Sequence, residues 1–318
     1  MLNPFFSVII PTFNQSNFLS RALDSVVNQN FNNFEIIVID NFSSDNTKKI
    51  VKSFKKKIIY KRIKNKGIIA KSRNVGIQIS KGKWLAFLDS DDLWSKNKLQ
   101  EIYNRIKKEN FDVICNDEWI KYENKSISSL WSYGPFQDNF YETLLRNGNC
   151  ISTSASIIKK NFLIKKKIKF NENKLFVTAE DYEFFLNISQ KRGSFFFLHK
   201  PLGLHLFHNK SASYNYFKHK KSLLSMLKYH VFKMQRFTLY KNKLWSEVKL
   251  NVELIEILNF FYKDFKRKKS ISEIFKIIKK KPSKFFQIFI KDIFNKVKRA
   301  IYYYINYIIK KPIFYEKN

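Results

Sequence analysis

The feature that most constrains this chain is an apolar run that ends abruptly in acidic residues. Residues 84–88 are apolar, and carboxylates follow at Asp89, Asp91 and Asp92. Such a run is typical of a buried strand in a parallel sheet, and open α/β sheets bind ligands just past the carboxyl ends of their strands. Closely spaced carboxylates favour a divalent cation, and Mg²⁺ or Mn²⁺ takes carboxylates together with phosphate oxygens. A polar loop in which Asp92 or Ser95 caps the next helix would explain the same residues.

Strand-like and helix-like segments alternate along the first 115 residues. The expected strands are residues 5–10, 34–39, 58–62, 83–88 and 112–115, and the expected helices lie near 16–27, 45–55, 68–79 and 96–108. This alternation predicts an α/β fold with a mostly parallel sheet flanked by helices. Right-handed crossovers place the carboxyl ends of the strands at one edge, so Asp40 is expected near Asp89 and Asp91.

The pattern is looser from about residue 116 to 175, where aromatic residues are scattered through polar segments. They would line a pocket or cover a sheet edge. Glu180 and Asp181 then open a helix, and acids in a first helical turn are common because they favour the positive end of the helix dipole. Short strands are expected at 195–198 and 202–207, followed by His208; a lone histidine is usually structural.

The net charge of +34 is concentrated toward the end of the chain, because residues 211–318 hold 26 Lys and Arg but only 7 Asp and Glu. Basic surface of this density attracts nucleic acid or anionic lipid headgroups. A coding sequence rich in A and T would also raise the lysine content without any partner. That bias does not explain why acids become scarce in the tail.

The tail is expected to form basic helices near 215–238, 246–264, 270–280 and 283–309. The last of these is amphipathic and aromatic-rich, which is typical of a helix lying in a membrane interface. The alternative is a helix packed on the preceding domain with a solvated lysine face. We therefore divide the chain into residues 1–210 and a helical extension, residues 211–318.

Several classes of protein are disfavoured by composition. No apolar run is long enough for a membrane-spanning helix, and the apolar residues 5–10 are too few for a signal peptide. The two cysteines form no CxxC pair, so neither a disulfide framework nor a zinc site is expected. These features predict a protein of a reducing compartment.

Four motifs in order resemble the family 2 glycosyltransferases. They are residues 7–14 (SVIIPTFN), the segment 35–47, residues 70–76 and residues 87–94 (FLDSDDLW). The resemblance spans about residues 5–210 and implies a GT-A fold, which is a Rossmann-like α/β architecture. Two departures occur: Asn41 and Phe42 follow Asp40 where the family often has Asp-Gly, and the arginine that relatives often carry near His208 is absent.

The resemblance also implies the site residues. Asp181 would be the catalytic base. Asp40 would bind the nucleotide base, Arg73 would lie near the diphosphate, and Asp89 would contact the ribose or the metal. The nucleotide-sugar site as a whole would comprise Pro11, Thr12, Asn14, Asp40, Arg73 and Asp89. A Mn²⁺ or Mg²⁺ ion would be held by Asp91 and Asp89, the two acids of the DxD pair, and by His208.

The activity implied by the resemblance is an inverting transfer of a sugar from a nucleotide-diphosphate sugar, expected to be a UDP-sugar. The acceptor would be a hydroxyl of a surface polysaccharide or lipid-linked glycan, reached from the cytoplasm at the inner, anionic face of the membrane. The alternative is a non-enzymatic polyanion-binding protein that acts through its basic tail. No recognised nucleic-acid motif supports it, and no nucleic-acid partner is expected.

Overall fold

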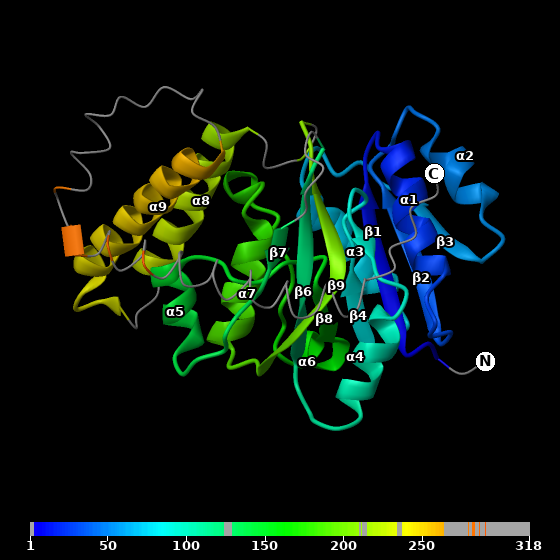
Figure 1. Cartoon of the computed structure of the whole chain (residues 1–318), viewed down its shortest axis with the longest axis horizontal. Coiled ribbons are helices and arrows are strands. Elements are labelled where there is room, and N and C mark those ends of the chain that lie inside the picture. Colours follow the sequence, from blue (N-terminus) through cyan, green and yellow to red (C-terminus); the bar gives the residue numbers. More distant parts are fainter. Residues whose placement is uncertain are drawn as a thin grey trace.

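The computed structural model describes residues 3–123, 129–209, 211, 215–233 and 237–263, together with residues 279, 282, 283, 286 and 290 (Figure 1). Its strands are β1 (Phe6–Thr12), β2 (Phe34–Asp40), β3 (Ile58–Arg62), β4 (Trp84–Phe87), β5 (Leu93–Trp94), β6 (Val113–Tyr122), β7 (Ser129–Trp131), β8 (Ser156–Lys159) and β9 (Phe195–Phe207). Its helices are α1 (Ser16–Val27), α2 (Thr47–Ser53), α3 (Ile69–Ile79), α4 (Lys98–Ile106), α5 (Phe140–Asn147), α6 (Lys160–Lys165), η1 (Lys174–Phe176), α7 (Glu180–Gln190), α8 (Tyr216–Lys233) and α9 (Lys241–Lys263).

The strands form one sheet in the order β3-β2-β1-β4-β8-β6-β9-β5, with β7 paired to β6. The pairs β3–β2, β2–β1 and β1–β4 are parallel, as the alternation of strands and helices predicts. Strand β8 runs antiparallel to both of its neighbours, β4 and β6. Consequently β4, β6 and β9 point the same way, and the segments after β4 and β9 meet at one edge of the sheet.

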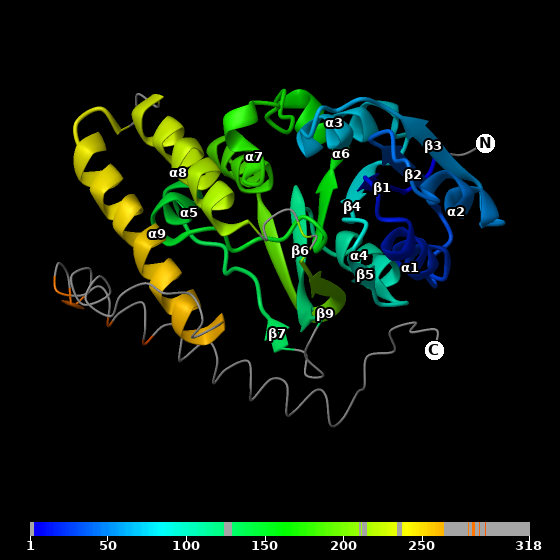
Figure 2. The same ribbon diagram turned by 90° about the horizontal axis from the view of Figure 1, so that it is seen from above.

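Alternate side chains of the central strands enter two separate cores. Val8 and Ile10 of β1 pack with α1, α2 and α4 on one face, whereas Ile9 packs with α3 and α7 on the other. Figure 2 shows α3 and α7 on one side of the sheet and α1 and α4 on the other. Burial on both faces explains why the strands read as nearly continuous apolar runs.

The chain between residues 116 and 175 holds more structure than the scattered aromatic residues indicate. Strand β6 continues to Tyr122, and β7, α5, β8, α6 and η1 follow it. Phe140 and Tyr141 of α5 are buried core residues. The two short strands expected after residue 195 are one strand, β9, which pairs with β6 through register shifts near Asn116 and Asp117.

Helices α8 and α9 lie side by side next to α5 and α7 (Figure 2). Met226 and Val231 of α8 and Leu244 of α9 are buried in the same apolar cluster as α5 and α7. The expected helices at 270–280 and 283–309 lie outside the described residues, apart from the five isolated positions given above. Within the described part of the chain, no helix is both long and apolar enough to cross a membrane.

Candidate active site

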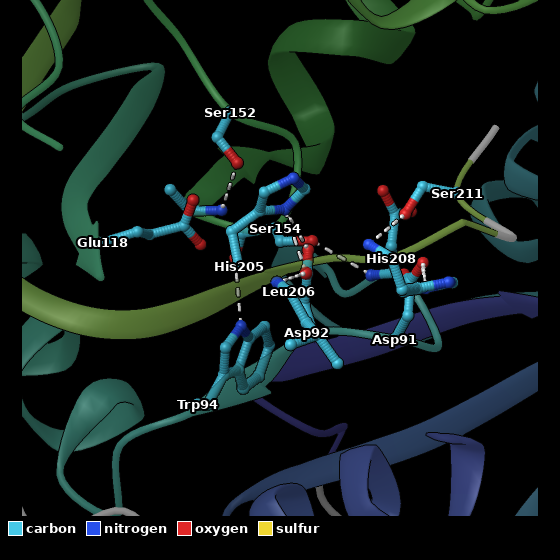
Figure 3. Close-up of polar contacts among 12 residues, drawn as sticks. Asp91, Asp92, Trp94, Glu118, Ser152, Ser154, His205, Leu206, His208 and Ser211 are labelled. Carbon is cyan, nitrogen blue, oxygen red and sulfur yellow. Dashed lines mark hydrogen bonds and ion pairs between the residues drawn. The ribbon is translucent and has the colours of Figure 1, made fainter. Parts of the chain in front are cut away.

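The acidic segment after β4 is attached to the end of β9. Oδ2 of Asp91 lies 2.9 Å from Nε2 of His208, 117 residues away in the sequence. The ring of His208 stacks on Phe18 of α1 at a centroid distance of 4.4 Å, and the imidazole is almost fully buried. Figure 3 shows the side chains of Asp91 and His208 pointing toward each other. The structure thus brings together two of the three predicted metal ligands.

Asp92 anchors the same segment from the inside of the protein. It caps no helix; its carboxylate lies 2.9 Å from Nδ1 of His205 and accepts the backbone N–H of Leu206 at 3.1 Å (Figure 3). Burial raises the pKa of Asp92 despite the opposing effect of His205. Burial lowers the pKa of His205, but the Asp92 carboxylate outweighs it and raises the value to about 10. Asp92 therefore fixes the position of its neighbour Asp91.

Arg73 of α3 connects the third predicted metal ligand, Asp89, with the start of α7. Its Nη2 donates to Oδ1 of Asp89 at 2.7 Å, and its Nη1 donates to Oε1 of Glu180 at 2.9 Å. The Arg73 side chain is only 4% exposed. Although burial opposes it, the charges of Asp89 and Glu180 raise the pKa of Arg73. Both terminal nitrogens thus bind carboxylates in this structure, and a direct contact of Arg73 with a diphosphate stays a prediction.

Asp181 lies at the amino-terminal end of α7, immediately after Glu180. Its Oδ1 accepts the backbone N–H of Tyr182 at 2.7 Å, and the residue is partly buried. Burial raises the pKa of Asp181 above its usual value, and the charge of Arg73 opposes this rise. A partly exposed carboxylate with a raised pKa is a better proton acceptor than a fully solvated one.

The two loops that are expected to bind the nucleotide are hydrogen-bonded to each other. The N–H of Asn14 donates to Oγ of Ser43 at 2.9 Å, and Oδ1 of Asn14 accepts the N–H of Ser44 at 2.8 Å. Asn14 has a left-handed backbone with a φ of 50°, and it follows Pro11 and Thr12 at the end of β1. The hydroxyl of Ser90 donates to Gln15 at 2.5 Å, which ties these loops to the acidic segment.

Asp40 is buried and already has protein partners on both oxygens. Oδ1 accepts the N–H and the hydroxyl of Ser43 at 2.9 and 2.5 Å. Oδ2 accepts the Tyr60 hydroxyl at 2.5 Å and Nε of Arg62 at 3.2 Å. A carboxylate offers about four lone-pair positions, so a nucleobase would have to displace one of these donors. Binding of a base by Asp40 stays a prediction.

A divalent cation fits this site only together with ligands from the substrate. Within the described residues, no three His, Cys, Asp or Glu side chains are arranged to hold a metal ion. Asp91 and His208 supply one carboxylate and one imidazole. Magnesium in nucleotide sites is commonly held by one or two carboxylates and by several phosphate oxygens or waters. The pair is therefore compatible with a cation that is bound along with a diphosphate.

Sequence reasoning did not identify several residues that hold the site in place. From the sequence, Glu180 is explained as an acid in the first turn of a helix, and only the fold reveals that its partner is Arg73. Lys98 is fully buried, its Nζ donates to the carbonyl of Ser154 at 2.7 Å, and burial lowers its pKa to about 8. The N–H of Asp89 donates to the Ser154 hydroxyl at 3.1 Å. No spacing in the sequence relates these residues, which come from separate elements.

Comparison with known proteins identifies the family. A model described as glycosyl transferase family 2 matches residues 7–168. Poly(ribitol-phosphate) beta-N-acetylglucosaminyltransferase TarP of Staphylococcus aureus is 30% identical over 235 residues, covering 66% of this chain and 68% of TarP. Glycosyltransferase GlyG of Streptococcus pneumoniae is 28% identical over 176 residues, covering 52% of this chain and 58% of GlyG. An uncharacterized glycosyltransferase of Rickettsia bellii is 39% identical over 144 residues, 44% of this chain but only 20% of that protein.

Solved structures show the same fold. S. aureus TarS superposes with a TM-score of 0.60 at 22% identity, over 82% of this chain and 46% of TarS. The structure of TarS 1–349 in complex with UDP-GlcNAc also gives a TM-score of 0.60, at 23% identity, over 81% of this chain and 75% of that one. The expected GT-A fold is confirmed. The chain belongs to glycosyl transferase family 2.

Proposed function

We propose that this enzyme transfers a sugar with inversion from a UDP-sugar to an acceptor hydroxyl in the synthesis of a cell-surface glycan. The observation that carries the proposal is the connection through Arg73. It bridges Asp89, at the expected donor side, and Glu180, the residue next to Asp181. One buried side chain thus holds both a donor-binding acid and the residue beside the base, and such fixed relative positions are what in-line transfer between two substrates needs.

In the proposed reaction, Asp181 accepts the proton of the acceptor hydroxyl. The hydroxyl oxygen then forms a bond to the anomeric carbon as the bond from that carbon to the diphosphate oxygen breaks. The raised pKa of Asp181 suits a general base. Asp91 and His208 would hold a divalent cation, whose charge would stabilise the departing diphosphate. The mannosyltransferase PcManGT, a structural neighbour at 14% identity, was solved with GDP-Man and Mn²⁺, which supports testing Mn²⁺ first.

Relatives support the choice of substrates. TarS has been solved with UDP and with UDP-GlcNAc, and TarP is named for poly(ribitol-phosphate). We infer a UDP-sugar donor and a glycan acceptor that carries phosphate or a lipid. The basic residues 211–318 would favour such an anionic acceptor or an anionic membrane surface.

The test measures UDP release and donor binding for UDP-GlcNAc, UDP-glucose and UDP-galactose, with Mn²⁺, with Mg²⁺ and with a chelator. Asp181→Asn should abolish turnover while leaving donor affinity within about twofold, because the base acts on the acceptor. Asp138→Asn replaces an exposed acid outside the site and should behave as wild type. Loss of donor binding in Asp181→Asn would refute its assignment as base.

The same experiment separates the enzyme from the competing function. A protein that binds none of these donors but binds DNA tightly, with strong salt dependence, would be a polyanion-binding protein acting through its tail.

Binding to phospholipid vesicles tests the proposed membrane association. Failure of the detergent-free protein to bind anionic phospholipid vesicles at low salt would exclude peripheral membrane association.

A further inference from the structure

The turn that precedes Asp181 has a strained backbone. Thr178 has a φ of +80°, a left-handed conformation that is unfavourable for a β-branched residue. Strain of this kind persists only where the surrounding structure holds it, and it is concentrated at functional sites. The turn connects η1 to α7, so its conformation determines where the first residues of α7, including Asp181, are placed.

One set of contacts holds the turn from the donor side. The N–H of Thr178 donates to Oε2 of Glu180 at 2.7 Å, while Oε1 of Glu180 accepts from Arg73 at 2.9 Å. Arg73 in turn donates to Asp89. The backbone of Thr178 is therefore connected to the acidic segment through buried charged groups.

A second set of contacts holds the turn from helix α8. Oγ1 of Thr178 lies 3.2 Å from Nδ1 of His219, at hydrogen-bonding distance. Phe176, at the end of η1, packs edge to face on Tyr229 of α8, with ring centroids 5.6 Å apart. Both ends of the strained segment thus touch α8, a helix that the sequence assigns to the basic extension. Figure 2 shows α8 lying alongside α7.

We propose that α8 is part of the catalytic unit and that His219 is a positioning residue, which holds the strained turn at Thr178 so that Asp181 faces the acceptor. The proposal rests on the proposed role of Asp181 as the base. Without the contact to His219, the Thr178 side chain would lose its anchor on α8, and the hydrogen bond from the Thr178 N–H to Glu180 would hold the strained backbone less firmly, so that the start of α7 could shift. A displacement of about 1 Å at a reacting group can lower a rate by about 100-fold.

The test compares His219→Ala, His219→Asn and Lys228→Ala, the last being an exposed residue of the same helix. UDP release from UDP-GlcNAc gives kcat and the donor KM. His219→Ala should lower kcat about tenfold or more with little change in donor KM, and His219→Asn, which keeps a hydrogen-bonding group, should recover part of the loss. Lys228→Ala should match wild type. Equal kcat in His219→Ala and wild type would overturn the proposal.

Substitutions at Thr178 test the hydroxyl separately from the backbone. Thr178→Ser keeps the group that contacts His219, whereas Thr178→Val keeps the shape and removes it. Thr178→Val should lower kcat by about as much as His219→Ala does. The double variant, Thr178→Val with His219→Ala, should lower kcat no further than either single variant, because all three proteins lack the same contact. Independent losses that multiply in the double variant would show that the two residues act separately and would contradict the proposal.

Amide hydrogen exchange gives a readout that needs no turnover. In His219→Ala the amides of residues 178–181 should exchange at least about tenfold faster than in wild type, and in Lys228→Ala they should not. Unchanged exchange would overturn the proposal. Asp181→Asn separates the proposed base from the proposed role of His219. An active Asp181→Asn protein would refute Asp181 as the base. If Asp181→Asn is inactive and His219→Ala is fully active, only the role of His219 is refuted.

Discussion

The guanidinium of Arg73 donates to the carboxylate of Asp89 at 2.7 Å, joining α3 to the segment that follows β4. The second nitrogen of the same fork donates to Glu180 at 2.9 Å. A planar guanidinium can serve two carboxylates at once in a fixed geometry, which a lysine ammonium does not reproduce. Arg73 is therefore the group that connects the acidic segment after β4, the proposed donor side, to the start of α7.

Replacement of this arginine should destabilise the fold. In Arg73→Met the Glu180 side chain, which is 8% exposed, would be left without its cation. Loss of one partner from a buried ion pair costs about 3–5 kcal/mol, and we expect a decrease of that order in the free energy of unfolding, measured by urea denaturation. Lys200→Met breaks the exposed pair with Glu101 and should cost about 1 kcal/mol or less. Equal costs would contradict the prediction.

Cation binding should depend on both Asp91 and His208. Each alanine variant should weaken the binding of Mn²⁺ in the presence of UDP by more than about tenfold, because each removes one of few protein ligands. Isothermal titration calorimetry measures this affinity, with Asp138→Ala as the control. Chelation should stop turnover in the wild type. Unchanged Mn²⁺ affinity in His208→Ala would restrict this residue to holding Asp91 in place.

Stability should fall with rising pH through the contribution of His205. Its pKa is raised to about 10 from 6.5, chiefly by the Asp92 carboxylate, with smaller effects of Glu118 and Asp91. Between these values the folded protein keeps a proton that the unfolded chain has lost, so the stabilisation is complete below about pH 6.5 and is lost as the pH approaches 10. His205→Gln should lack this loss. The difference in unfolding free energy between wild type and His205→Gln should therefore be larger at pH 6 than at pH 10. An equal difference at the two pH values would refute the stabilisation assigned to protonated His205.

The predicted division at residue 210 can be tested by truncation. A chain of residues 1–210 would lose the apolar contacts that Met226, Val231 and Leu244 make with α5 and α7. We expect a lower melting temperature and aggregation compared with residues 1–263, because apolar surface of α5 and α7 would face water. Thermal unfolding followed by circular dichroism measures the difference. Equal melting temperatures would show that residues 1–210 are an independent domain.

Local sequence patterns determined the first half of the fold. The apolar runs at β1, β2 and β4 and the helical periodicities between them predicted a parallel sheet, because strand and helix periods depend on near neighbours. They also placed Asp40, Asp89 and Asp91 at the ends of strands. The short strand β5 and the elements between residues 123 and 175 were not predicted, because their pairing depends on partners far along the chain.

Only the tertiary structure decided how the candidate site is assembled. Asp91 meets His208 across 117 residues, and Arg73 meets Glu180 across 107. Local pattern assigned Glu180 to a helical first turn, and His208 was related to Asp91 only through the family resemblance, as a predicted metal ligand. The strained turn at Thr178 and its contact with α8 had no local signal. Such contacts depend on where the sheet order and the helix packing bring distant segments, and no periodicity within one segment carries that information.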